Sequence, residues 1–209
     1  MTSLTRDTET RPAARRASCP YDLAKRALDL VLAAVGLLIL CPLCAAIALA
    51  IWRDDPGPVI FRQRRIGLHG REFMMLKFRS MVMNAPNVST EAMKAMGTSF
   101  YTRIGAFLRR SSLDEIPQLW NVLRGDMSLV GPRPALYTQG DLIAMRKRSG
   151  VHDVRPGITG LAQVEGRDDL GLEAKVENDR RYVANRSIWL DIWVIWRTVA
   201  AVASARGNY

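Results

Sequence analysis

Two adjacent carboxylates, Asp114 and Glu115, follow two serines and directly precede Ile116-Pro117. Because proline is tolerated in the first turn of a helix, this segment predicts a helix that begins at or just before Asp114. One interpretation is structural, with Asp114 as the N-cap and its acidic neighbour complementing the helix dipole. The other is chemical: one carboxylate attacks a phosphoryl centre to give an acyl-phosphate, and the second holds Mg²⁺ beside the substrate phosphates. Spacing alone leaves both interpretations open.

Three groups of cationic or glycine-rich residues could bind phosphate. In Gly131-Pro132-Arg133-Pro134 the prolines fix the backbone on both sides of one guanidinium, which suits bidentate phosphate binding. Lys77 and Arg79 alternate with apolar residues, so a half-buried strand would place both cations on one face. The backbone amides of Arg155-Pro156-Gly157-Ile158-Thr159-Gly160 could cradle an anion. Each pattern also fits an ordinary feature, respectively a rigid loop with an exposed arginine, a solvated strand edge and a common turn.

The overall charge favours an anionic partner. The 209 residues include 30 Lys and Arg against 20 Asp and Glu, a formal net charge of +10. Such an excess is typical of proteins that meet nucleic acid, anionic lipid or phosphorylated substrates. Without zinc-ligand spacing, an aromatic nucleic-acid signature or a basic recognition helix, nucleic-acid binding is not expected. Three cysteines and two histidines argue against a disulfide framework and a histidine-based metal site.

An uncharged stretch from Leu30 to Trp52 predicts a membrane helix. Its 23 residues would extend about 35 Å as a helix, enough to cross a hydrocarbon core of about 30 Å. Pro42 near its middle would kink the helix, and basic residues on both flanks favour the cytoplasm for both ends. These residues are Arg15, Arg16, Lys25 and Arg26 before the stretch, and Arg53, Arg62, Arg64 and Arg65 after it. A spanning helix and a re-entrant helix that returns to the same face are equally compatible with these features.

The remaining pattern predicts an α+β fold, predominantly α-helical with a small β-hairpin. Residues 1–20 are expected to form a basic mobile arm, and 21–209 a single membrane-associated domain. Within it, 21–52 form the membrane helix and 53–209 the cytoplasmic catalytic part. Strands are predicted at 59–63 and 72–79, and helices at about 89–96, 102–111, 114–124, 135–149, 172–185 and 187–204. Trp189, Trp193 and Trp196 share one face of the last helix, which favours an amphipathic helix in the membrane interface over a core helix.

Taken together, four segments in order resemble the bacterial sugar transferase family, the small monotopic phosphoglycosyl transferases. The resemblance runs from about residue 21 to 204, and its long Gly-Asp-Met-Ser block is highly specific. The segments are Lys77-Phe78-Arg79-Ser80-Met81, Ser112-Leu113-Asp114-Glu115, Gly125-Asp126-Met127-Ser128-Leu129-Val130-Gly131-Pro132-Arg133-Pro134 and Arg155-Pro156-Gly157-Ile158-Thr159-Gly160.

The resemblance implies an Mg²⁺-dependent enzyme on the cytoplasmic face of the bacterial inner membrane, among anionic lipids. It would transfer a sugar 1-phosphate from a UDP-sugar to undecaprenyl phosphate, releasing UMP, as the first membrane step of polysaccharide or glycoconjugate assembly. Asp114 would carry the covalent phosphosugar, and Glu115 would assist with metal and proton handling. A re-entrant membrane helix, kinked at Pro42, is also implied. Phosphate would be bound by Arg133, Lys77, Arg79 and Arg155, and the donor by Gln163, Arg167, Asp179, Arg180 and Tyr182.

Some positions depart from the commoner family pattern. The break in the membrane helix is Cys41-Pro42 where Ser-Pro is frequent, although the proline that bends the helix is kept. Leu161 and Glu165 stand where Trp and Asn are frequent, in a loop that selects the sugar or nucleotide. No particular sugar is therefore expected.

Two rival functions remain. A transferase that moves only the sugar would release UDP, but a carboxylate nucleophile beside a proline-framed arginine fits attack at phosphorus better. A non-catalytic membrane scaffold of a polysaccharide assembly complex would need Asp114 only as a helix cap.

Overall fold

The structure is a computed structural model that describes residues 20–86, 100–165 and 171–203. Its described part is predominantly helical, as expected from the sequence, and contains two small sheets, of which one was predicted. The predicted N-terminal arm up to residue 19, the predicted helix 89–96 and Arg167 lie outside the described residues.

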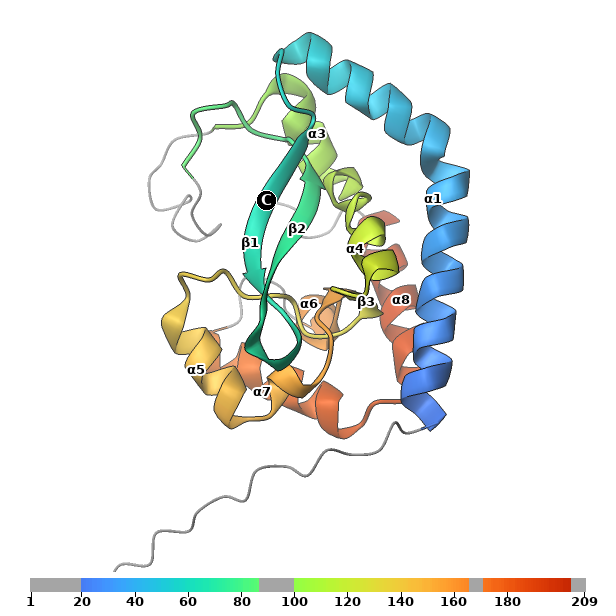
Figure 1. Ribbon diagram of the computed structural model, residues 1–209, viewed down its shortest axis with the longest axis vertical. Coiled ribbons are helices and arrows are strands. Elements are labelled where there is room, and N and C mark those ends of the chain that lie inside the picture. Colours follow the sequence, from blue (N-terminus) through green and yellow to red (C-terminus); the bar gives the residue numbers. More distant parts are fainter. Residues whose placement is uncertain (1–19, 87–99, 166–170, 204–209) are drawn as a thin grey trace, which may run out of the picture.

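The longest element is α1 (Pro20–Asp54), which contains Pro42. By length and composition alone it could cross a membrane. Only four of its residues are buried, and large apolar side chains such as Leu38 and Ile39 are exposed. In Figure 1 the ribbon of α1 runs along one side of the molecule and changes direction in its upper half. This exposed apolar surface is what a helix surrounded by lipid requires.

The predicted hairpin is present. Strand β1 (Ile60–Ile66) pairs antiparallel with β2 (Glu72–Phe78), from Ile60 opposite Phe78 to Ile66 opposite Glu72. A short 3₁₀ turn, η1 (Leu68–Gly70), connects them. The first strand is longer than predicted because it stays paired through Ile66.

A second sheet was not predicted. In it, β3 (Ser128–Val130) pairs parallel with β4 (Gly157–Thr159). Gly131 N–H donates to Thr159 O, and Gly157 N–H donates to Pro132 O. A Cβ on Gly157 would lie 2.1 Å from Gly131 N, so this close backbone approach requires glycine. The predicted anion cradle at 155–160 is therefore wrong at Gly157, whose amide is already used within the protein.

Three helices lie close to their predicted positions: α3 (Arg103–Arg110), α7 (Leu172–Ala184) and α8 (Ile188–Ala203). Two begin later than predicted: α4 (Gln118–Arg124), which the 3₁₀ turn η2 (Leu113–Glu115) precedes, and α5 (Gly140–Arg148). Two short helical segments, η3 (Val151–Asp153) and α6 (Leu161–Glu165), were not predicted. Helix α5 does not begin at 135, because Ala135 O accepts from Ile66 N–H and Leu136 bridges to Arg65.

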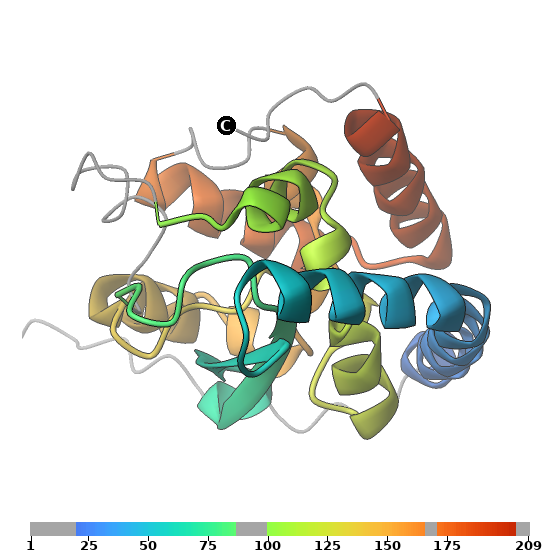
Figure 2. The ribbon, with the colours of Figure 1, turned by 90° about the horizontal axis from the view of Figure 1, so that it is seen from above.

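Several elements pack against α1. Its N-terminal half lies beside α4 and β3, and its C-terminal half packs on α3. Seen from above, the hairpin and α8 lie on opposite sides of the C-terminal half of α1 (Figure 2). The buried apolar clusters Ala33–Met75–Val122–Met127 and Ile47–Ile51–Phe78–Leu108 therefore fasten the hairpin, α3 and α4 to the membrane helix.

Candidate active site

The two carboxylates lie in the 3₁₀ turn η2 between α3 and α4. Ser112, the residue before this turn, has φ 57°, a left-handed conformation that is uncommon for a residue other than glycine. Helix α4 begins only at Gln118, and Pro117 occupies its N-cap position. The helix-cap interpretation of Asp114 is therefore wrong, because Asp114 is separated from the helix it was expected to cap. Its side chain is instead buried, with the residue 2% exposed.

Strand β2 brings Lys77 to these carboxylates. Lys77 Nζ lies 2.7 Å from Glu115 Oε1 and 3.9 Å from Asp114 Oδ2. Arg133 Nη2 donates to the same Glu115 oxygen at 3.1 Å. The structure thus brings together four residues predicted from separate motifs, two anionic and two cationic.

The two carboxyls differ electrostatically although they are adjacent. Burial raises the pKa of Asp114; Lys77 opposes this effect and Glu115 adds to it. Burial acts to raise the pKa of Glu115 as well, but Lys77 and Arg133 outweigh it and hold that pKa well below its usual range. Burial lowers the pKa of Lys77, although Glu115 counteracts it. Lys77 and Arg133 therefore favour the charged form of Glu115, whereas burial disfavours the charged form of Asp114.

Asn121 of α4 holds this arrangement in place. Its side chain is completely buried and pairs with the outer edge of β2. Leu76 N–H donates to Asn121 Oδ1 at 2.9 Å, and Asn121 Nδ2 donates to Met74 O at 2.8 Å. These two hydrogen bonds join α4 to the backbone of β2. Because η2 directly precedes α4, and Lys77 directly follows Leu76 in β2, they also fix η2 relative to Lys77.

Lys77 and Arg133 also line a cavity of about 690 Å³, within the size range of small-molecule sites. No carboxylate occurs among the described residues that line it. Its cationic lining residues are Arg62, Arg65, Lys77, Arg79, Arg109 and Arg133. Apolar residues from Pro58 to Phe61 and from Met81 to Met83 form much of the remaining wall. This composition suits a ligand with phosphate groups and a less polar part.

Arg79 has a buried guanidinium that is paired with Asp55, its Nη2 lying 3.5 Å from Asp55 Oδ2. It is 5% exposed, its Nη1 lies 2.8 Å from Met83 Sδ, and its Nη2 contacts Asp55 O. Its Nε has no hydrogen-bond partner among the described residues. A buried donor without an acceptor is costly, and an anionic group in the cavity would supply one.

Asp114 and Glu115 do not line this cavity, nor do five residues predicted to bind phosphate or donor, Arg155, Gln163, Asp179, Arg180 and Tyr182. Arg155 Nε donates to Gly125 O at the C-terminal end of α4, near Arg26. Gln163 Nε2 donates to Ile158 O. Asp179 is buried and paired with Arg146. Their roles in phosphate and donor binding remain predictions, as does that of Tyr182.

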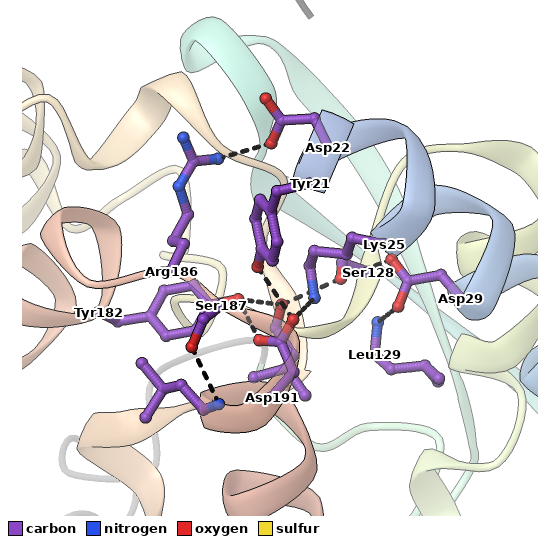
Figure 3. A network of polar contacts seen from close by, with 12 residues as sticks. Tyr21, Asp22, Lys25, Asp29, Ser128, Leu129, Tyr182, Arg186, Ser187 and Asp191 are labelled. Atoms are coloured by element: carbon purple, nitrogen blue, oxygen red, sulfur yellow. Dashed lines mark hydrogen bonds and ion pairs between the residues drawn. The ribbon is translucent and has the colours of Figure 1, made fainter. Parts of the chain in front are cut away.

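Tyr182 belongs to a polar network that joins α7 and α8 to the start of α1 (Figure 3). Its hydroxyl lies 2.8 Å from Asp191 Oδ1 and 3.0 Å from Val130 O. Tyr21 OH and Lys25 Nζ each donate to Asp191 Oδ2 at 2.9 Å. These contacts fix the position of α8 relative to α1.

Leu161 and Glu165, which were expected in a loop, lie instead on the short helix α6, so the loop prediction is wrong at these two positions. Leu161 is buried in a cluster with Tyr182, and Glu165 is exposed and pairs with Arg181. Arg180, on α7, pairs with Glu177 on the surface.

Sequence reasoning missed Asn121 and Arg146. An asparagine inside a short helix and an arginine among charged neighbours give no signal by spacing. Their importance appears only from what they touch in the folded chain.

Comparison with known proteins shows the family of this chain. The family model described as bacterial sugar transferase matches residues 20–205, so the chain belongs to that family. It is 43% identical over 196 residues to the UDP-glucose:undecaprenyl-phosphate glucose-1-phosphate transferase of Xanthomonas campestris, an alignment covering 90% of this chain and 40% of that protein. The Escherichia coli protein of the same name is 44% identical over 185 residues, covering 85% of this chain and 39% of that protein.

A shorter relative matches along most of its length. The exopolysaccharide production protein ExoY of Rhizobium meliloti is 36% identical over 207 residues, covering 90% of this chain and 88% of that protein. This chain thus spans about two fifths of the two glucose-1-phosphate transferases and most of ExoY.

Proposed function

We propose that this protein transfers a sugar 1-phosphate from a UDP-sugar to undecaprenyl phosphate and releases UMP. The observation that carries this proposal is the buried Asp114 carboxylate beside Glu115, Lys77 and Arg133, of which Lys77 and Arg133 line a cationic cavity. The names of the relatives supply the substrate classes, a UDP-sugar and undecaprenyl phosphate.

The reaction has two displacements at one phosphorus. In the first, an Asp114 oxygen attacks the phosphorus that bears the sugar, and the bond to the bridging oxygen breaks, so UMP leaves with that oxygen. In the second, an oxygen of undecaprenyl phosphate attacks the same phosphorus and breaks its bond to Asp114. The products are undecaprenyl-diphosphate-sugar and the free carboxylate.

The neighbouring residues assist this chemistry through charge and position. Burial leaves the Asp114 carboxylate poorly solvated, which favours nucleophilic attack once it is ionised. Arg133, whose side chain is 41% exposed, can turn one guanidinium edge to Glu115 and another to a phosphate. Lys77 stabilises negative charge that develops on the transferred phosphoryl group.

The donor set also fits Mg²⁺. Two adjacent carboxylates offer hard oxygen ligands, and both cationic contacts of Glu115 go to one oxygen, Oε1. No cluster of three or more His, Cys, Asp or Glu that could hold a metal occurs in the described part of the chain. Mg²⁺ is commonly held by one or two carboxylates together with substrate phosphates. When bound by Asp114 and Glu115, the ion would neutralise phosphate charge.

We further propose that α1 is re-entrant and that the catalytic part lies on the cytoplasmic face of the inner membrane. Pro42 and the basic flanks of the apolar stretch support this topology. Helix α8 would lie in the interface among anionic lipids, since Trp189, Trp193 and Trp196 are all exposed, at 81%, 40% and 63%. This arrangement keeps Asp114 within reach of a lipid-linked phosphate.

The test is UMP release by the purified protein in nanodiscs with Mg²⁺, undecaprenyl phosphate and a panel of UDP-sugars. UDP-glucose is the first donor, and UDP-galactose and UDP-N-acetylgalactosamine follow because relatives carry those names. Release of UMP that depends on undecaprenyl phosphate supports the proposal. Release of UDP would identify sugar transfer instead, and no turnover with any donor would favour the scaffold.

A further inference from the structure

The loop that carries Arg133 is fastened almost entirely through its carbonyl groups. Pro132 and Pro134 have no N–H to donate, so this loop cannot be held by a normal ladder of backbone bonds. Instead, four successive carbonyls accept from donors on three elements, β4, α5 and β1. The donors are Gly157 N–H to Pro132 O (3.0 Å), Arg146 Nη1 to Arg133 O (2.7 Å), Arg65 Nη1 to Pro134 O (3.0 Å) and Ile66 N–H to Ala135 O (3.0 Å).

Two of these donors are arginine side chains that are themselves oriented by a neighbour. Arg146 uses Nε and Nη2 on Asp179 Oδ2, at 2.9 and 2.6 Å, and keeps Nη1 for Arg133 O. Arg65 repeats this pattern with Gln63 Oε1, at 3.1 and 2.6 Å, and keeps Nη1 for Pro134 O. In each case Nε and Nη2 donate to the neighbouring side chain, and Nη1 donates to a carbonyl of the loop.

The Arg146–Asp179 pair is the more deeply buried of the two. Arg146 is 5% exposed and Asp179 is 1% exposed, on α5 and α7 respectively. A buried ion pair is seldom a gain in stability over apolar residues of similar size, so its presence here calls for another explanation. Asp179 does not line the cavity, and its carboxylate is paired with Arg146.

Resting on the proposed function, we infer that Arg146 and Asp179 are positioning residues that set the direction of Arg133. The chain of contacts runs from Asp179 to Arg146, to the carbonyl of Arg133, and through the Arg133 guanidinium to Glu115. It ties the carboxylate turn to α5 and α7, two helices that contribute no lining residue to the cavity.

The test replaces the pair by apolar residues, in the variant Arg146→Met/Asp179→Leu. Removing both charges avoids leaving one charge buried without its partner. Because a misplacement of about 1 Å can cost about 100-fold, kcat/KM for the UDP-sugar should fall about 10- to 100-fold. The matched control is Glu177→Gln on α7, which breaks an exposed ion pair with Arg180 and should leave kcat/KM unchanged.

A double-mutant cycle separates positioning from a general structural role. In an Arg133→Ala background the apolar pair should lower kcat/KM by less than about 3-fold more, since the guanidinium it directs is gone. If the apolar pair lowers kcat/KM by the same factor with and without the Arg133 side chain, the inference is overturned. Wild-type kcat/KM in the folded Arg146→Met/Asp179→Leu protein would also overturn it. If that protein fails to fold, Arg146→Lys decides: it keeps the buried charge but cannot span both contacts, and wild-type kcat/KM would overturn the inference.

Amide hydrogen exchange of residues 131–136 gives a readout that does not need activity. Faster exchange in the apolar variant, and not in Glu177→Gln, is expected. If the wild type releases no UMP while exchange changes as expected, the proposed function fails and the loop-fastening contacts stand. Unchanged exchange with an active wild type would overturn only the positioning role.

Discussion

Replacing Asp114 by Asn removes the proposed nucleophile while keeping the size and most of the shape of its side chain. With an effective dielectric constant of about 20, Lys77 attracts Asp114 by about 4 kcal/mol at 3.9 Å and Glu115 by about 6 kcal/mol at 2.7 Å. Lys77 thus keeps its closer partner in the variant. Burial outweighs the attraction at Asp114, because the pKa of this carboxyl is raised on balance.

A raised pKa in the folded state means that ionising Asp114 weakens folding as the pH rises through that pKa. A neutral amide avoids this cost, so at neutral pH the Asp114→Asn protein should be as stable as the wild type or more so. For a chain of this size, 1 kcal/mol shifts Tm by about 2–4 °C. Activity should behave in the opposite way and fall by about 10³-fold or more, since no carboxylate remains to form the acyl-phosphate.

The assay combines thermal melting, UMP release and intact-protein mass after incubation with the UDP-sugar alone. The wild type should gain the mass of a sugar phosphate, and the Asn variant should not. Asp141→Asn, which alters an exposed carboxylate at the start of α5, is the matched control and should behave as the wild type. Turnover above a tenth of the wild-type rate in Asp114→Asn would refute the covalent mechanism, and a Tm lowered by more than about 4 °C would refute the burial argument.

Four further outcomes are expected. Lys77→Met should move the acid limb of the kcat/KM pH profile to higher pH, because Lys77 opposes the burial that raises the pKa of Asp114; an unmoved limb would contradict this. Arg133→Ala should raise KM for the UDP-sugar by about 10-fold or more, as measured by steady-state UMP release. Arg133→Lys should restore KM only in part, because lysine cannot form the bidentate contact of a guanidinium. Removing Mg²⁺ with EDTA should abolish UMP release and added Mg²⁺ should restore it, so full activity in EDTA would count against the metal. Pro42→Leu should straighten α1 towards a spanning helix, so that cysteine labelling places its two flanks on opposite sides of the membrane instead of both in the cytoplasm.

Local patterns were enough to predict much of the fold. The uncharged run Leu30–Trp52 marked the long apolar helix, and residue alternation marked the hairpin with Lys77 on it. Such features depend on the period of apolar residues and on proline and glycine, which act within a few residues of themselves. The parallel pairing of β3 with β4 was not predicted, because three-residue strands carry too short a pattern and their partners are far apart along the chain.

The sequence by itself determined which residues could do phosphoryl chemistry, since Asp114, Glu115, Lys77 and Arg133 each stand in a motif whose residue types suit it. Only the tertiary structure decided that these four meet, and that Asp114 is buried instead of capping a helix. It also decided that Arg146 pairs with Asp179 and donates to the backbone carbonyl of Arg133. The physical reason is that burial and long-range hydrogen bonds depend on how helices and strands pack, which no spacing along the chain records.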